Sequence, residues 1–238
     1  MNLFGSDDLA AVLLSLKVAM FAILGGLPLA FAVACALARG RFPGRALLDA
    51  AVHLPLVLPP VATGFALLVL FGRRGVFGHA LEVVGIVLAF RWMGAALAAS
   101  IMAFPLMVRP IRLAIEAIDR EVDEAALTLG AGPLTRLWRV TIPLAGPGLA
   151  AGAVLGFAKA LGEFGATITF VAAIPGETLT LPTAIYQASQ NPGGEVHTLA
   201  LCGVAATIAL GAVLASDAFR NRSIGPGSQA ARKAGLRH

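Results

Sequence analysis

The sequence has few charged residues and almost no cysteine. Asp, Glu, Lys and Arg together make up 13% of its 238 residues, whereas an ordinary soluble domain has about 25%. Its two cysteines, Cys35 and Cys202, lie inside apolar segments, and neither has a partner at a metal-ligand spacing. We therefore expect both thiols to be buried as small hydrophobic side chains, and we expect no cysteine-ligated metal site.

Motifs of enzyme active sites are also lacking. The sequence contains no GxSxG, no phosphate-binding GxxxxGK(S/T) loop and no paired aspartates in facing spans. The histidines His53, His79 and His197 show no metal-ligand spacing either. We therefore expect a chain that is not an enzyme and binds no metal or cofactor, so that any ATP would be bound by another chain.

Long apolar runs take the place of the missing charge. Hydrophobic residues make up 58% of the chain, and the mean hydropathy is +0.85. Because a helix that crosses the hydrocarbon core needs roughly 20 apolar residues, we predict an all-α integral membrane protein with about five transmembrane helices. The predicted spans are 9–38, 46–71, 92–108 (with a continuation to 118 left open), 145–173 and 196–215.

Three segments depart from simple spans. The second span contains Pro55, Pro59 and Pro60, and each proline removes a backbone donor, so we expect this helix to kink or unwind. The apolar stretch 181–190 is too short to cross a bilayer, and we predict a re-entrant or periplasmic helix there. Another short, amphipathic helix is predicted near 77–84.

The distribution of basic residues predicts the orientation in the membrane. Thirteen Lys and Arg residues lie in 39–45, 109–139 and 220–238, against three in the 72–91 loop. Positive residues favour the cytoplasmic side, so we place the N-terminus outside and the C-terminus in the cytoplasm. This orientation accounts for the net charge of +5, and nucleic-acid binding is not needed to explain it.

Small and ionisable residues in the fourth span are candidate functional positions. Gly148, Gly152 and Gly156 form a small-xxx-small ridge, which allows close packing within the bundle or across a dimer. Lys159 and Glu163 follow, also four residues apart. Ionisable groups at membrane depth are costly, so these two either neutralise each other or line a translocation route.

Two arginines, Arg73 and Arg74, break the charge rule by lying on the predicted outer side. They either contact lipid headgroups and solvent, or they attract an anion or an acidic partner to an outer mouth.

A polar interruption, EAALTLGAGPLTRLWRVTIP, occupies 124–143 on the predicted cytoplasmic side. Its EAA is followed by Gly130, nine residues, and then Val140 and Pro143. This pattern resembles the EAA signature of ABC-importer permeases, with Val140 and Ile142 standing where the family has Ile and Leu. The signature is long and its spacing fits throughout, so the resemblance is specific.

The resemblance extends over about 12–217, and several pieces, among them FPGRALLD, HLPLVLPP and LGEFGATITF, look like molybdate permease subunits. It implies a type I importer permease domain over 9–217 with a cytoplasmic coupling segment over about 119–143. The tail 218–238 shows no match, and we expect it to be cytoplasmic and disordered. Sulfate permeases look similar around Gly162, so sulfate, thiosulfate and tungstate stay open as alternatives.

The resemblance also implies partners and a mechanism. Two copies of the chain would form a pathway in the bacterial inner membrane, above an ATPase dimer that holds ATP and Mg, and a periplasmic binding protein would deliver molybdate. Helix 121–129 would dock into the ATPase, and the spans would alternate between inward-facing and outward-facing states. The residues assigned to this coupling are Glu124, Ala125, Ala126, Gly130, Val140 and Pro143.

A translocated oxyanion needs backbone N–H groups, hydroxyls or positive charge along its route. The candidate pathway residues are Pro59, Pro60, Thr63, Lys159, Glu163, Thr167 and Thr169. A secondary transporter or channel is a rival interpretation, which predicts inverted repeats or a midplane carboxylate pair. The sequence shows neither of these features. An intramembrane enzyme is a weaker rival, because no nucleophile and base pair is visible.

Overall fold

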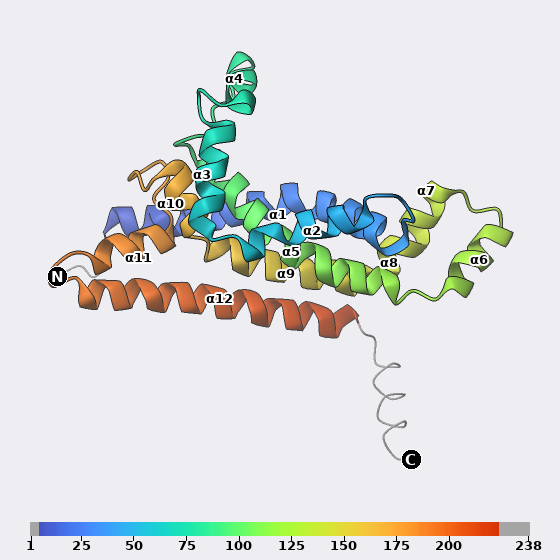
Figure 1. Cartoon of the computed structure of the whole chain (residues 1–238). Coiled ribbons are helices and arrows are strands. Elements are labelled where there is room, and N and C mark those ends of the chain that lie inside the picture. The colour runs from blue at the N-terminus through green and yellow to red at the C-terminus, as the bar shows by residue number, and fades with distance from the viewer. Residues whose placement is uncertain (1–4, 224–238) are drawn as a thin grey trace.

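The computed structural model describes residues 5–223, and these residues form helices joined by turns and short loops. Figure 1 shows an elongated bundle in which α1 (Ser6–Arg39), α5 (Trp92–Glu116), α9 (Gly146–Leu161) and α12 (Glu195–Ser223) run along the same long direction. Three helices, Ser6–Arg39, Trp92–Glu116 and the Glu195–Ala212 part of α12, are long and apolar enough to cross a membrane, or up to five spans if two bent helix pairs each count as one. This range includes the predicted number.

Small side chains form the centre of the bundle. Helix α1 contributes buried Ala19, Ala22, Ala30 and Ala34, and α5 contributes several more alanines. Such residues let helix backbones approach closely in a membrane protein. Helix α9 continues this packing with its glycine ridge, which faces α5.

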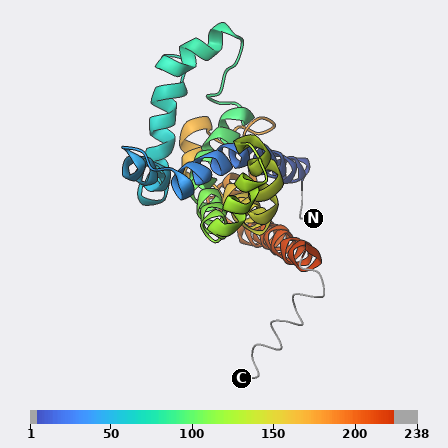
Figure 2. The ribbon, with the colours of Figure 1, turned by 90° about the vertical axis from the view of Figure 1, so that its right-hand side faces the viewer.

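The predicted second span is two helices, α2 (Arg45–Val57) and α3 (Pro60–Phe71), that meet at 113°. The chain turns at Leu58 and Pro59. The turn occurs there because Pro59 and Pro60 lack a backbone N–H and so interrupt the helical hydrogen bonds. Helix α3 therefore turns away from α2 and packs with its first turns against α10, and α4 (Val76–Val83) follows it outward. Figure 2 shows the end of α3 and all of α4 projecting away from the other helices.

The predicted fourth span is also broken. Helix α9 ends at Leu161, and α10 (Gly165–Val171) begins after a three-residue break. Gly162 caps α9, and the Glu163 side chain accepts a hydrogen bond from the Ala166 backbone N–H in the first turn of α10. The predicted span 145–173 therefore consists of two helices, because local glycines and a side-chain cap interrupt it.

Helix α11 (Leu181–Ser189) packs against α1 and α12, and most of its inward side chains are buried. Helix α12 continues to Ser223, six residues into the predicted tail. The rest of that tail, 224–238, lies outside the described residues.

The cysteine prediction holds only in part. Cys35 is half-buried on α1, but Cys202 is exposed on α12. The expectation of burial was wrong for Cys202 because α12 lies at the edge of the bundle and only one face of it packs against α9 and α11. Large apolar side chains such as Leu199 and Leu210 are exposed on the same helix.

Candidate functional site

The segment 119–143, which we call the coupling segment, lies at one end of the bundle. It consists of α6 (Arg120–Thr128), α7 (Pro133–Arg136), a π-helical turn η1 (Leu137–Thr141) and α8 (Ile142–Leu144). In Figure 1, α6 and α7 extend beyond the ends of the long helices. No side chain of α6 is buried. A helix with no buried face makes a poor structural element by itself and suits contact with another molecule.

A Schellman turn ends α6. Gly130 has φ of +78°, a left-handed conformation that glycine adopts without steric cost. The backbone N–H of Gly130 donates to the Leu127 carbonyl at 2.9 Å, and that of Ala131 donates to the Ala126 carbonyl at 3.0 Å. These two hydrogen bonds satisfy carbonyls that the helix end would leave free. Gly130 therefore sets the direction in which the chain leaves α6.

The coupling segment exposes both its signature residues and large apolar side chains. Glu124, Ala125, Gly130 and Pro143 are exposed, while Ala126 and Val140 are half-buried. The large exposed apolar side chains of this segment are Val122, Leu127, Leu129, Leu134 and Trp138, with Leu129 at 86%. An exposed apolar group of this size beside charged residues is typical of a protein–protein contact.

One arginine outside the segment holds it against the bundle. Arg39 Nη1, at the end of α1, lies 2.9 Å from Asp123 Oδ2 on α6 and donates to Thr141 Oγ1 of η1 at 3.2 Å. In the sequence, Arg39 stands out only as one of the basic residues that favour the cytoplasmic side. No sequence pattern connects residues so far apart along the chain, so only the fold brings them together.

A cleft of about 620 Å³ lies beside this contact, between the end of α1, the 40–45 loop, the end of α5 and the coupling segment. Its walls carry five arginines and three carboxylates, so both signs of charge face the space. The charged lining residues are Arg39, Arg41, Arg45, Arg120, Arg136, Glu116, Asp123 and Glu124.

The candidate pathway residues from two distant parts of the sequence meet where α3 packs against α10. A Cβ atom placed on Gly64 would lie 2.5 Å from the Ala166 carbonyl oxygen, and one on Gly165 would lie 2.7 Å from Pro60 Cβ. The helices therefore touch backbone to backbone.

The threonine hydroxyls near this contact have different surroundings. Thr63 is 8% exposed, and its Oγ1 is buried without a hydrogen-bond partner within the described structure. Thr167 is also buried. Thr169 Oγ1 instead donates to the Gly165 carbonyl at 2.8 Å, so its hydroxyl is already used within α10. Pro59 and Pro60 are exposed at the bend between α2 and α3.

Lys159 and Glu163 form a direct ion pair at the break between α9 and α10. Lys159 Nζ lies 2.6 Å from Glu163 Oε2, and Glu163 Oε1 accepts the Ala166 N–H at 3.1 Å. The Glu163 side chain is 1% exposed and the Lys159 side chain 29%. A carboxylate buried this deeply needs both partners. The geometry therefore accounts for the pair as mutual neutralisation with a helix cap, one of the two interpretations left open above.

The glycine ridge faces α5. A Cβ atom on Gly152 would lie 2.8 Å from the Met107 carbonyl oxygen, and one on Gly156 would lie 2.6 Å from Met107 Cγ. A Cβ on Gly148 would lie 2.4 Å from Ala114 Cβ. All three glycines are thus used for packing within one chain.

Arg73 and Arg74 lie apart from the pathway candidates. Both are exposed in the turn between α3 and α4, beside a hollow of about 430 Å³ that Phe90 also lines. This turn is on the part of the chain that projects from the bundle in Figure 2.

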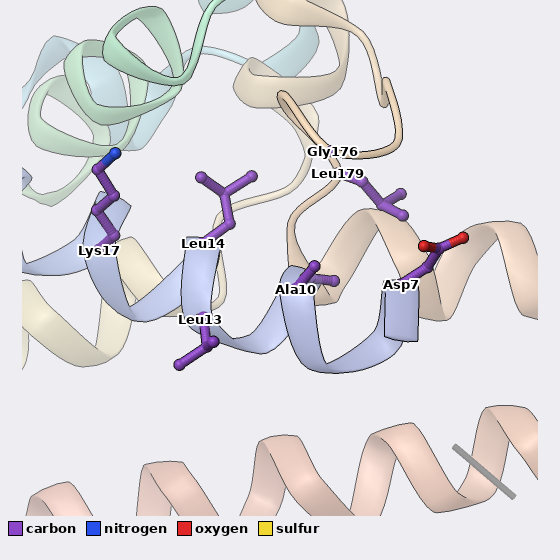
Figure 3. A pocket seen from close by; sticks show the side chains of 8 residues that line it. Asp7, Ala10, Leu13, Leu14, Lys17, Gly176 and Leu179 are labelled. Atoms are coloured by element: carbon purple, nitrogen blue, oxygen red, sulfur yellow. The ribbon is translucent and has the colours of Figure 1, made fainter. Parts of the chain in front are cut away.

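A smaller pocket of about 240 Å³ lies between the start of α1 and the loop before α11. Figure 3 shows Asp7, Leu14 and Lys17 of α1 on one side and Gly176 and Leu179 on the other. The Lys17 ammonium lies 3.7 Å above the Trp92 ring, and a cation over an indole face is already stabilised there. Among the described residues, no group of three or more His, Cys, Asp or Glu side chains could hold a metal ion.

Comparison with known proteins identifies a family. The family model described as binding-protein-dependent transport system inner membrane component matches residues 26–217. The molybdenum transport system permease protein ModB of Escherichia coli strain K12 is 53% identical over 208 residues, 87% of this chain and 91% of that protein. The corresponding ModB protein of Haemophilus influenzae is 48% identical over 216 residues, 90% of this chain and 94% of that protein.

A solved structure shares the fold. The crystal structure of a bacterial ABC transporter involved in the import of the acidic polysaccharide alginate superposes with a TM-score of 0.75 at 19% identity, covering 93% of this chain and 82% of that one. At this low identity the likeness concerns the arrangement of helices alone.

Proposed function

Because the chain belongs to the family of binding-protein-dependent transport system inner membrane components, we propose that it is the permease subunit of an ATP-driven importer of molybdate. Two curated molybdenum permeases that are about half identical to this chain over nearly their whole lengths support the choice of molybdate. In this proposal the chain performs no chemistry, and the ATP is bound and hydrolysed on a partner.

The single observation that carries the proposal is the exposed coupling segment with the EAA spacing. Helix α6 buries none of its side chains, and Leu129 beside it is 86% exposed. An ATPase that received α6 in a cleft would cover this apolar surface. Glu124 would then pair with a basic group on the ATPase, and the small side chains of Ala125 and Ala126 would allow close approach.

The mechanism follows from what α6 is attached to. Helix α5 leads into α6, and η1 with α8 leads into α9, so a displacement of the coupling segment reaches two central helices at once. Closure of an ATPase dimer around ATP would move α6, and the bundle would alternate between inward-facing and outward-facing states. Differential binding of ATP to one state would supply the driving force.

The orientation and the assembly belong to the same proposal. The coupling segment and the C-terminus face the cytoplasm and the N-terminus lies outside, as the excess of Lys and Arg in the cytoplasmic loops favours. Two copies of the chain enclose the route in the bacterial inner membrane. A periplasmic binding protein delivers the anion to the outer side, where Arg73 and Arg74 would attract it.

The proposed route passes the contact of α3 and α10. Thr63 offers a hydroxyl without a partner in the described structure, and Thr167 lies buried nearby on α10. A hydroxyl can donate to an oxyanion. The ion pair of Lys159 and Glu163 fixes the start of α10 and so positions these hydroxyls.

Transport into proteoliposomes tests the proposal. The purified complex of this chain with its ATPase is reconstituted with ATP inside and the binding protein outside, and uptake of radiolabelled molybdate is measured. We expect uptake that requires hydrolysable ATP and that resists a tenfold excess of sulfate or thiosulfate. A non-hydrolysable ATP analogue is the control.

Other outcomes would contradict parts of the proposal. Equal competition by sulfate would make the chain a sulfate permease, and preferential uptake of tungstate would assign it to tungstate. Uptake without ATP would indicate a secondary transporter or channel.

A further inference from the structure

The contact between Arg39 and the coupling segment carries an inference beyond docking. In the part of the chain that the structure describes, the pair of Arg39 and Asp123 is the only side-chain hydrogen bond or ion pair that joins α6 to another element. The same Arg39 nitrogen also donates to Thr141, which is 1% exposed at the end of η1. One guanidinium thus holds residues on both sides of the α6–α7 turn.

The position of Arg39 decides what this contact can transmit. Arg39 is the last residue of α1, a helix of 34 residues that packs along α5 and α9 and is roughly 50 Å long at 1.5 Å per residue. Near its other end, Ser15 Oγ accepts the backbone N–H of Leu181 at 2.6 Å. Helix α1 therefore joins the coupling segment at one end to α11 at the other.

We propose that Arg39 is a positioning residue for coupling, which ties the coupling segment to α1 so that a movement of α6 also moves α1. The inference rests on the proposed function, since it takes the docked ATPase as the source of that movement. Without this contact, α6 would act on the bundle only through its covalent links to α5 and to η1. The π-helical turn that contains Thr141, an irregularity of a kind frequent at functional sites, would then absorb part of the movement.

The alternative explanation is that Arg39 only stabilises the fold and has no role in coupling. The side chains of Arg39 and Asp123 are 35% and 23% exposed, and ion pairs this accessible add little to folding stability. A basic residue in the last turn also favours the helix dipole of α1 without any partner. If that were the whole role of Arg39, Asp123→Asn would be silent, and only changes at Arg39 would matter.

The test measures coupling rather than activity alone. Arg39→Gln, Asp123→Asn and the reversed pair Arg39→Asp with Asp123→Arg are each purified with the ATPase and reconstituted. Molybdate uptake is divided by ATP hydrolysed. We expect both single variants to retain the ATPase and hydrolyse ATP, with a fall of about fivefold in this ratio, the upper end of what a partly exposed ion pair contributes. The reversed pair should recover at least half of the wild-type ratio.

Arg41→Gln is the matched control, because Arg41 lines the same cleft and forms no ion pair among the residues the structure describes. We expect it to keep the wild-type ratio. An unchanged ratio in Asp123→Asn, or a ratio in the reversed pair no better than in the single variants, would overturn the inference. Absence of ATP-driven uptake in the wild-type complex would instead contradict the proposed function, so the two failures are distinguishable.

Discussion

The coupling segment and the region 159–190, which we call the α11 end, lie toward opposite ends of the molecule and are built differently (Figure 1). In the α11 end, polar side chains are buried and most have partners: Thr178 Oγ1 accepts from Ile174 N–H and donates to the Val171 carbonyl. In the coupling segment, no residue of α6 is fully buried. The side chain of Arg39 links α6 to the bundle through one partly exposed ion pair and reaches η1 through one hydrogen bond.

This difference indicates which of the two regions can change shape at lower cost. A buried polar group that loses its partner costs about 1–3 kcal/mol, so each buried hydrogen bond in the α11 end resists rearrangement. A partly exposed ion pair contributes about 0.2–1 kcal/mol, and water replaces it readily. We therefore expect substitutions in the α11 end to lower stability and substitutions in the coupling segment to lower transport while leaving the fold intact.

The largest effect is expected at the ion pair of the α11 end. Lys159→Met leaves Glu163, 1% exposed, as a buried carboxylate without its cation, which costs about 3 kcal/mol or more. We expect a large fall in the yield of folded permease, measured by size-exclusion chromatography in detergent. The double variant Lys159→Met with Glu163→Gln should recover most of the yield, because no charge remains buried.

Lys17→Met is the matched control, since Lys17 is an exposed lysine on α1 whose partner is a neutral ring. A normal yield for Lys159→Met would show that the ion pair does not stabilise the α11 end. The expected difference in stability between the two ends would then be wrong.

A second prediction concerns the turn that ends α6 in the coupling segment. Gly130→Val places a β-branched residue at φ of +78°, and the backbone strain of about 1–3 kcal/mol redirects the chain after α6. We expect ATP-driven uptake to fall more than tenfold while the thermal unfolding midpoint of the permease changes little. Gly132→Ala is the control, because Gly132 has an ordinary φ of −65° and open space around it. A matching loss of uptake in the control would contradict the prediction that uptake depends on the left-handed conformation of Gly130.

A third prediction concerns the hydrogen bond between α1 and α11. Ser15→Ala removes the buried acceptor of the Leu181 N–H and should lower stability by about 1–3 kcal/mol. Thermal unfolding in detergent measures this change. Thr207→Ala removes an exposed hydroxyl on α12 and should leave the unfolding midpoint unchanged.

The smallest effect is expected at the exposed apolar surface of the coupling segment. Leu129→Ser removes a side chain that is 86% exposed and that a docked ATPase would cover, so we expect the Kd for the ATPase to rise about fivefold, or about 1 kcal/mol. Microscale thermophoresis with the detergent-solubilised permease measures the Kd. Val83→Ser, equally exposed on the projecting α4 at 78%, is the control, and an equal rise in both variants would argue against docking at Leu129.

Much of this architecture is predictable from local sequence. The starts of α1 and α5, the short helices at 76–83 and 181–189, and the helix in the EAA stretch all match their predicted positions to within about three residues. The prolines at 59 and 60 predict a kink, but not that it amounts to 113°. Gly162 and Gly165 permit a bend, but hydropathy alone does not show that the helix ends there, because the apolar stretch continues past the side-chain cap of Glu163.

The sequence by itself determined the class of the protein, the apolar helices and the spacing of the coupling segment. Hydropathy and local hydrogen bonding act over a few residues, so they can be read along the chain. Tertiary structure decided that α3 meets α10 and that Arg39 reaches both Asp123 and Thr141. These contacts join residues about 80 to 100 positions apart, and only the packing of whole helices sets such distances.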